Sequence, residues 1–130
     1  MPGFNFKGNP PAPPRICRTK GTPSSIKMAW QICSTAPEDQ AYYFAVYRFV
    51  GAEVGSFTDP ANLLSITKFN PENWWLEDQA VREGEYYTYV VTSFNRNNVE
   101  SFSSEPVVMK KTKRGARRIG GTWYSKILKQ

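Results

Sequence analysis

The chain has 130 residues, of which 40% are hydrophobic and 22% are charged, and it carries a formal net charge of +6. This length suits one domain with a core of useful size, and the composition is ordinary for a globular protein. No run reaches the roughly 18 apolar residues needed to span a bilayer, and the first residues lack the basic-then-apolar pattern of a signal peptide.

The positive charge is concentrated at one end of the chain. Residues 1–109 hold nine Lys/Arg and eleven Asp/Glu, whereas residues 110–130 hold eight Lys/Arg and no acid. We therefore expect a basic C-terminal extension over residues 111–130 that behaves as a flexible tail. Trp123 and Tyr124 lie in it, so nucleic acid or an anionic surface is an alternative partner, although the acidic body opposes nucleic acid.

The chain begins with a proline-rich stretch that includes Pro10, Pro11, Pro13 and Pro14. Such a composition predicts a semi-rigid linker over residues 1–13, leading from another domain. The folded domain is then expected over residues 14–110.

From Ile16 onward the apolar residues alternate with a period of two, which indicates β-strands. The range 41–50 is apolar on both faces, as expected of a central strand or of one whose outer face is also covered. Asp59 followed by Pro60 predicts a short helical turn near residues 59–64. Strands are expected near residues 16–20, 26–30, 41–50, 73–78, 86–93 and 99–109, with Pro106 favouring an edge or a bulge in the last. These six ranges, with one further strand between residues 50 and 86 that has no assigned range, predict an all-β fold, a seven-stranded antiparallel β-sandwich.

Four motifs in order resemble an immunoglobulin-like module, the fibronectin type III domain. They are Trp30, the segment 44–48, the segment 81–84 followed by 87–91, and the segment 98–101. The resemblance implies that Trp30 fills the core and that Tyr87 forms a tyrosine corner, with its hydroxyl bonded to upstream backbone.

A narrower resemblance rests on the succession AVYRF, TDPANLLSIT and GEYYTYVVTSFNRNNVES. It is similar to the C-terminal fibronectin type III-like module of bacterial family 10-like glycoside hydrolases. This resemblance implies a monomeric, non-catalytic accessory module that spaces or stabilises an upstream catalytic domain in the same polypeptide, with polysaccharide as a further partner. It also implies a secreted protein, located outside the cell, in the periplasm or on the outer-membrane surface, whose export signal is encoded elsewhere.

The aromatic residues near position 87 divide between two faces of a strand. Tyr87 and Tyr89 are expected in the core, whereas Tyr86 points the other way. Tyr86 would join Tyr43 and Tyr47 in an outward aromatic patch, which serves either cross-strand pairing or docking of another protein. A protein interaction module is therefore an alternative function.

The pair Trp74 and Trp75 is the candidate for carbohydrate contact. Adjacent residues of a strand point to opposite faces, so one of the two rings is expected outside. An exposed indole beside polar residues such as Asn73 suits stacking on a sugar ring. The other interpretation, that both rings pack against residues 59–66, stays open.

The residue inventory argues against an enzyme, a metal site or a cofactor. The chain has no histidine, and Cys17 and Cys33 lack the spacing of a metal motif. A disulfide between them stays open for an exported protein, although the expected strand register does not set the two residues opposite each other. Two pairs of adjacent acids are interpreted as solvated turn residues rather than as a catalytic couple, Glu38-Asp39 and Glu77-Asp78.

Overall fold

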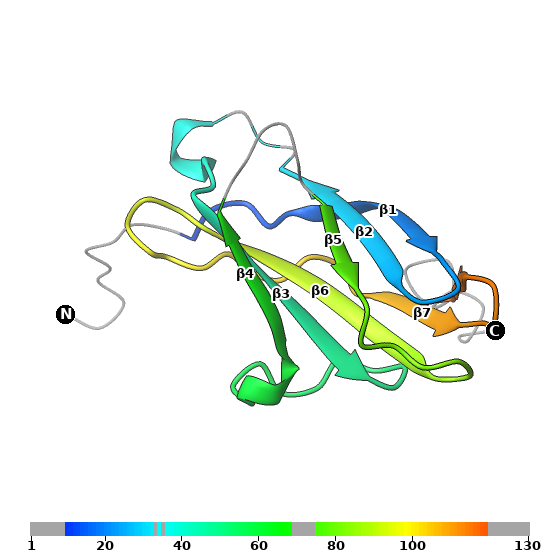
Figure 1. The fold of residues 1–130 in the computed structure, drawn as a ribbon. Coiled ribbons are helices and arrows are strands. Elements are labelled where there is room, and N and C mark those ends of the chain that lie inside the picture. The colour runs from blue at the N-terminus through cyan, green and yellow to red at the C-terminus, as the bar shows by residue number, and fades with distance from the viewer. Residues whose placement is uncertain (1–9, 33, 35, 69–74, 120–130) are drawn as a thin grey trace, which may run out of the picture.

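The computed structural model describes residues 10–32, 34, 36–68 and 75–119 as two antiparallel β-sheets packed face to face (Figure 1). The three-stranded sheet has the order β1–β2–β5, formed by Arg15–Gly21, Ile26–Gln31 and Trp75–Asp78. The five-stranded sheet has the order β4–β3–β6–β7–β8, formed by Leu63–Lys68, Tyr43–Val50, Tyr86–Phe94, Val107–Lys111 and Ala116–Arg118. The helical elements of this part of the chain are two three-residue turns, Pro37–Asp39 (η1) and Pro60–Asn62 (η2), and neither could cross a membrane.

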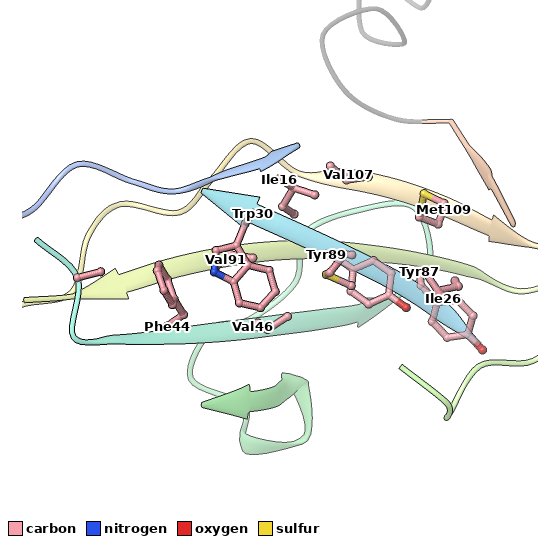
Figure 2. Packing of buried hydrophobic residues seen from close by; sticks show 12 residues of the cluster. Ile16, Ile26, Trp30, Phe44, Val46, Tyr87, Tyr89, Val91, Val107 and Met109 are labelled. Atoms are coloured by element: carbon pink, nitrogen blue, oxygen red, sulfur yellow. The ribbon is translucent and has the colours of Figure 1, made fainter. Parts of the chain in front are cut away.

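The core lies between the inward faces of β2 and β6, where the period-two alternation places it. Trp30 comes from β2 and meets Phe44 of β3 edge to face, with ring centroids 5.6 Å apart. Tyr87 and Tyr89 project from β6 into the same layer (Figure 2). Rings of this size remove 150–250 Å² each from water, so these few residues account for much of the apolar burial between the sheets.

The turn before β6 fixes Tyr87. Gly84 has a φ of +87°, which a residue without Cβ adopts at little cost. The Tyr87 hydroxyl accepts a hydrogen bond of 2.7 Å from the backbone N–H of Arg82, five residues upstream. This is the contact that the fibronectin type III resemblance implies for a tyrosine corner.

Two strands differ from the sequence-based expectation. β4 lies where no strand range was predicted, and it begins directly after η2, whose Asp59 side chain accepts from the N–H of Ala61 at 2.9 Å. Strand β7 begins after Pro106 and lies between β6 and β8, so it is not an edge strand. Pro106 therefore precedes the ladder and removes no hydrogen bond from it.

The basic segment after Met109 contributes an eighth strand, where a flexible tail was expected. The Thr112 N–H donates to the Gly115 carbonyl at 2.8 Å, which closes a hairpin and pairs β8 with β7. Gly21 of β1 lies so close that a Cβ there would overlap the backbone of Ala116. The β7–β8 hairpin therefore closes one end of the sandwich, and residues 120–130 of the expected tail lie outside the described residues.

The described part of the proline-rich stretch lies against the sandwich. Pro11 and Pro14 are buried. The Ala12 N–H donates to Asp39 Oδ1 at 2.8 Å, and its carbonyl accepts from Ser93 Oγ at 3.3 Å. At least residues 11–14 thus pack on the domain and do not lead away from it as free linker.

Candidate binding surfaces

Trp75 lies on the outer face of the three-stranded sheet. It is 49% exposed and pairs with Ala29 of β2, whose neighbour Met28 points into the core. Since side chains alternate along a strand, Trp75 and Ala29 both face outward. The other two residues of the expected carbohydrate contact, Trp74 and Asn73, lie outside the described residues.

The three tyrosines of the expected interaction face have different environments. Tyr43 is 42% exposed, whereas Tyr47 is only 8% exposed. Tyr86 is half-buried, and the Lys110 Nζ lies 5.5 Å from the centre of its ring. The outward face of β3 and β6 is therefore not one open aromatic patch.

Tyr47 is buried because the connection between β3 and β4 folds back over the sheet. Phe57 of this connection packs edge to face on Tyr47 at 4.9 Å and on Phe49 at 5.3 Å, measured between ring centroids. Beneath Phe57, Tyr47 and Phe49 form a second apolar cluster outside the sandwich core together with Ala45 and Val90. The two-sided apolar pattern of residues 41–50 thus reflects both a central position in the sheet and a covered outer face.

The Tyr47 hydroxyl belongs to a small polar network at the edge of this cluster. It donates to Glu100 Oε2 at 2.8 Å, and Thr92 Oγ1 donates to the same oxygen at 2.6 Å. Burial, followed by the hydrogen bond and negative charge of Glu100, raises the pKa of Tyr47 from 10.0 to about 12. The phenol is therefore a hydrogen-bond donor at all ordinary pH values.

Beside the covered cluster an apolar area stays open to solvent. Tyr43 pairs with Lys68, Ala45 with Ile66, and Tyr47 with Leu63. These outward side chains thus lie next to one another on the two strands. The most exposed is Ile66, at 60%. We call this area the β3–β4 patch, formed by Tyr43, Phe57, Leu63 and Ile66.

Asp78 was expected to be a solvated turn residue, and this expectation is wrong. The residue is 2% exposed and is the last residue of β5. Arg48 Nη1 approaches both carboxylate oxygens, at 2.9 and 3.0 Å, and the Tyr89 hydroxyl donates to Asp78 Oδ2 at 2.7 Å. Burial and the neighbouring carboxylate raise the pKa of Tyr89. Charge pairing and hydrogen bonding explain why this acid is buried at all.

Asp78 has no oxygen left for chemistry on a substrate. Besides Arg48 and Tyr89, it accepts the backbone N–H of Ala80 at 3.1 Å. A general acid or base must reach its substrate within hydrogen-bond distance, and these contacts occupy the carboxylate inside the fold. Its arrangement is that of a structural ion pair.

Lys111 is a structural residue that the sequence analysis assigned to the tail. It is 2% exposed, and its Nζ donates to the carbonyl oxygens of Pro23 at 3.1 Å and Thr112 at 2.5 Å. These bonds tie the β1–β2 turn to the β7–β8 hairpin. In the sequence, a lysine within a basic run looks like a solvated residue. The one local sign of a folded hairpin there is Gly115, at the turn that follows Lys111.

The described residues contain no group of three or more side chains suited to hold a metal ion. Cys17 is a free, exposed thiol whose Sγ lies 3.6 Å from the Ala29 carbonyl oxygen. Cys33 lies outside the described residues.

No model of a known protein family matches the sequence, and no curated protein matches it. Several solved structures are similar in fold. A structure described as a myokine is 16% identical over 78% of this chain and 98% of its own, with a TM-score of 0.58. The Caenorhabditis elegans twitchin kinase region, named by its parts Fn31-NL-kin-CRD-Ig26, is 14% identical over 81% of this chain and 17% of its own, with a TM-score of 0.61.

A β-1,2-glucanase from Parabacteroides distasonis is 19% identical over 78% of this chain and 12% of its own, with a TM-score of 0.56. Thus the chain spans nearly all of one neighbour and a small part of the other two. Identities this low establish the fold alone. The chain adopts a fibronectin type III-like β-sandwich, an architecture generally found in non-catalytic modules.

Proposed function

We propose that this chain is a non-catalytic accessory module that positions or stabilises a catalytic domain of the same polypeptide. The observation that carries the proposal is the β3–β4 patch, because four exposed, large apolar side chains lie together there. Contiguous exposed apolar surface marks a contact with another protein surface.

The patch is suited to a folded neighbour because its base is rigid. Ile66 and Tyr43 project from paired strands, and Phe57 is held by two ring contacts. Lys68 and Glu100 lie at the margin beside Tyr43 and Tyr47, where they provide a charged rim. An apolar centre with a polar margin is the usual composition of such contacts.

The neighbour we favour is a polysaccharide-cleaving domain. The sequence resembles the accessory module of bacterial glycoside hydrolases, and the same fold accounts for 12% of the β-1,2-glucanase chain. Polysaccharides are found outside the cytoplasm, so the location we propose is the cell exterior, the periplasm or the outer-membrane surface. Weak contact with the glycan through Trp75 belongs to the same proposal.

The size of the natural product tests the proposal. Antibodies against the domain should detect a polypeptide much longer than 130 residues, and the purified product should cleave a polysaccharide. A natural product of 130 residues alone would contradict the accessory role.

A substitution in the patch tests its use within the longer product. Ile66→Asp should lower the melting temperature and the half-life of the catalytic domain. In the isolated module the unfolding free energy should change by about 0.5 kcal/mol or less, because Ile66 is mostly exposed. Val50→Asp is the matched control, since Val50 is slightly more exposed, at 68% against 60%, but lies beyond the β4 pairing. Equal effects of the two variants on the catalytic domain would refute docking through this patch.

A further inference from the structure

The outer face of the three-stranded sheet carries a row of basic side chains beside Trp75. The register pairs Arg15 with Gln31, Arg18 with Ala29, and Lys20 with Lys27. On the other side of β2, Ala29 pairs with Trp75 and Lys27 pairs with Glu77. Since Met28 and Ile26 point inward, all of these paired residues face outward.

This face is more strongly cationic than the rest of the described domain. Its outward residues include four cations, Arg15, Arg18, Lys20 and Lys27, and one carboxylate, Glu77, which gives a balance of +3. The other described residues, those of the β7–β8 hairpin included, hold ten Lys/Arg and nine Asp/Glu, a balance of +1. Within the described part of the chain none of the four cations forms an ion pair, and Glu77 accepts from Ser25 Oγ at 2.7 Å.

Trp75 and Arg18 flank a small residue. Ala29 lies between them in the row across the sheet, and neighbouring strands are about 4.8 Å apart, so Trp75 and Arg18 project from backbones about 10 Å apart. Only a methyl group separates these two long side chains. A ring stacked on the indole thus lies within reach of the guanidinium group, which binds carboxylates with paired N–H donors.

We propose that this face binds an acidic glycan, with a sugar ring on Trp75 and uronate carboxylates on Arg18, Lys20 and Lys27. The proposal rests on the carbohydrate contact proposed above and adds the ligand's charge. Charge complementarity supports it, because four cations without carboxylate partners in the described structure lie on the two strands next to a single flat apolar ring.

The same features disfavour two other anionic partners. Proteins that bind single-stranded nucleic acid stack successive bases on several aromatic residues, and Trp75 is the one described aromatic residue on this face. An anionic membrane would attract the four cations, but Trp75 is the one large apolar side chain described on this face, so little apolar area could insert into the bilayer.

Affinity measurements on the 130-residue chain test the proposal, with polygalacturonate, a neutral glucan, single-stranded DNA and anionic lipid vesicles as probes. Polygalacturonate should bind best, and its affinity should fall as salt rises. Trp75→Ala should weaken binding about tenfold, while Trp75→Tyr should retain most of it. The double variant Arg18→Gln, Lys20→Gln should also weaken the binding of polygalacturonate about tenfold.

Two controls match these variants. Arg117→Gln removes an exposed cation of β8, on the other sheet, and Phe102→Ala removes an exposed aromatic ring in the β6–β7 connection. Neither should change the affinity for polygalacturonate. Melting temperatures of all variants identify any loss that is due to unfolding.

Several outcomes would overturn the proposal. Binding of the neutral glucan that depends on Trp75 but not on Arg18 and Lys20 would keep the carbohydrate contact and refute the acidic ligand. Tighter binding of DNA or of vesicles than of polygalacturonate would refute a glycan ligand. A loss of polygalacturonate affinity in Arg117→Gln equal to that in the double variant would refute binding at this face. The natural product's size and the Ile66→Asp variant do not depend on these results, so the accessory role fails or stands separately.

Discussion

The interior of the sandwich and the outer face of the five-stranded sheet each contain a tyrosine that donates to a carboxylate. Inside, the Tyr89 hydroxyl donates to Asp78 at 2.7 Å, and outside, the Tyr47 hydroxyl donates to Glu100 at 2.8 Å. The two hydrogen bonds are nearly equal in length. The two carboxylates differ in the charges near them and in how deeply they are buried.

The inner carboxylate is enclosed and neutralised. The Asp78 side chain is 1% exposed and has Arg48 as its ion-pair partner. Glu100, in contrast, is an exposed residue. In the described structure its carboxylate accepts hydrogen bonds from the hydroxyls of Tyr47 and Thr92 only. The cost of leaving a charge without a partner rises steeply with burial. We therefore expect the inner network to determine whether the domain folds and the outer one to adjust its stability.

The largest expected effect is from Asp78→Ala, which leaves the Arg48 guanidinium without its buried partner. The free energy of unfolding should fall by about 3 kcal/mol, measured by urea denaturation. Glu77→Ala on the same strand should cost less than about 1 kcal/mol, because Glu77 is exposed. Adding Arg48→Met to Asp78→Ala should restore part of the loss, since it removes the unpaired cation. Equal losses for the two acids would show that the inner pair is not special.

A smaller effect is expected from Phe57→Ala, which uncovers the outer cluster. The variant loses ring contacts with Tyr47 and Phe49 and should be destabilised by about 1.5 kcal/mol. It should also bind more of the dye ANS, because Tyr47 and Phe49 become accessible. Phe102→Ala is the control, since Phe102 is more exposed, and should cost at most about 0.5 kcal/mol. If both variants behaved alike, Phe57 would not be the cover of this face.

Local alternation was sufficient to predict most of the fold. Residues with period two and turn formers between them correctly predicted the two-layered β architecture. β8 was not predicted because its charges resemble those of a tail. Lys111, at the base of its hairpin, donates to the Pro23 carbonyl in the β1–β2 turn, 88 residues away in sequence. A contact over that distance leaves no local pattern in the chain.

The candidate surfaces were harder to predict than the fold, for the same reason. Asp78 looks solvated beside Glu77, and its burial depends on Arg48, which is 30 residues distant. Tyr47 looks outward by alternation, yet Phe57 of the β3–β4 connection packs on its ring. In both cases a distant residue changes the environment of a side chain whose direction was predicted correctly.

The smallest expected effect concerns the Tyr47 hydroxyl and its dependence on pH. The pKa of this phenol is about 12 in the folded protein, against 10.0 ordinarily. Between these values the unfolded chain loses the proton while the native state keeps it, so stability falls as pH rises. The contribution is fully present below about pH 10 and is lost by about pH 12. The difference in unfolding free energy between the wild type and Tyr47→Phe should therefore shrink across this range, measured by urea denaturation at each pH.

Glu100→Gln separates the two causes of that pKa. It removes the negative charge beside the Tyr47 hydroxyl but leaves Phe57 in place over the ring. Since burial is the larger cause and the Glu100 interactions come second, the pH range of the effect should become narrower without disappearing. Complete loss of the pH effect in this variant would mean that the carboxylate, and not the cover that Phe57 provides, controls the tyrosine. Water would then reach the Tyr47 ring despite Phe57. The two tyrosine–carboxylate pairs would differ only in that Asp78 is buried and Glu100 is exposed.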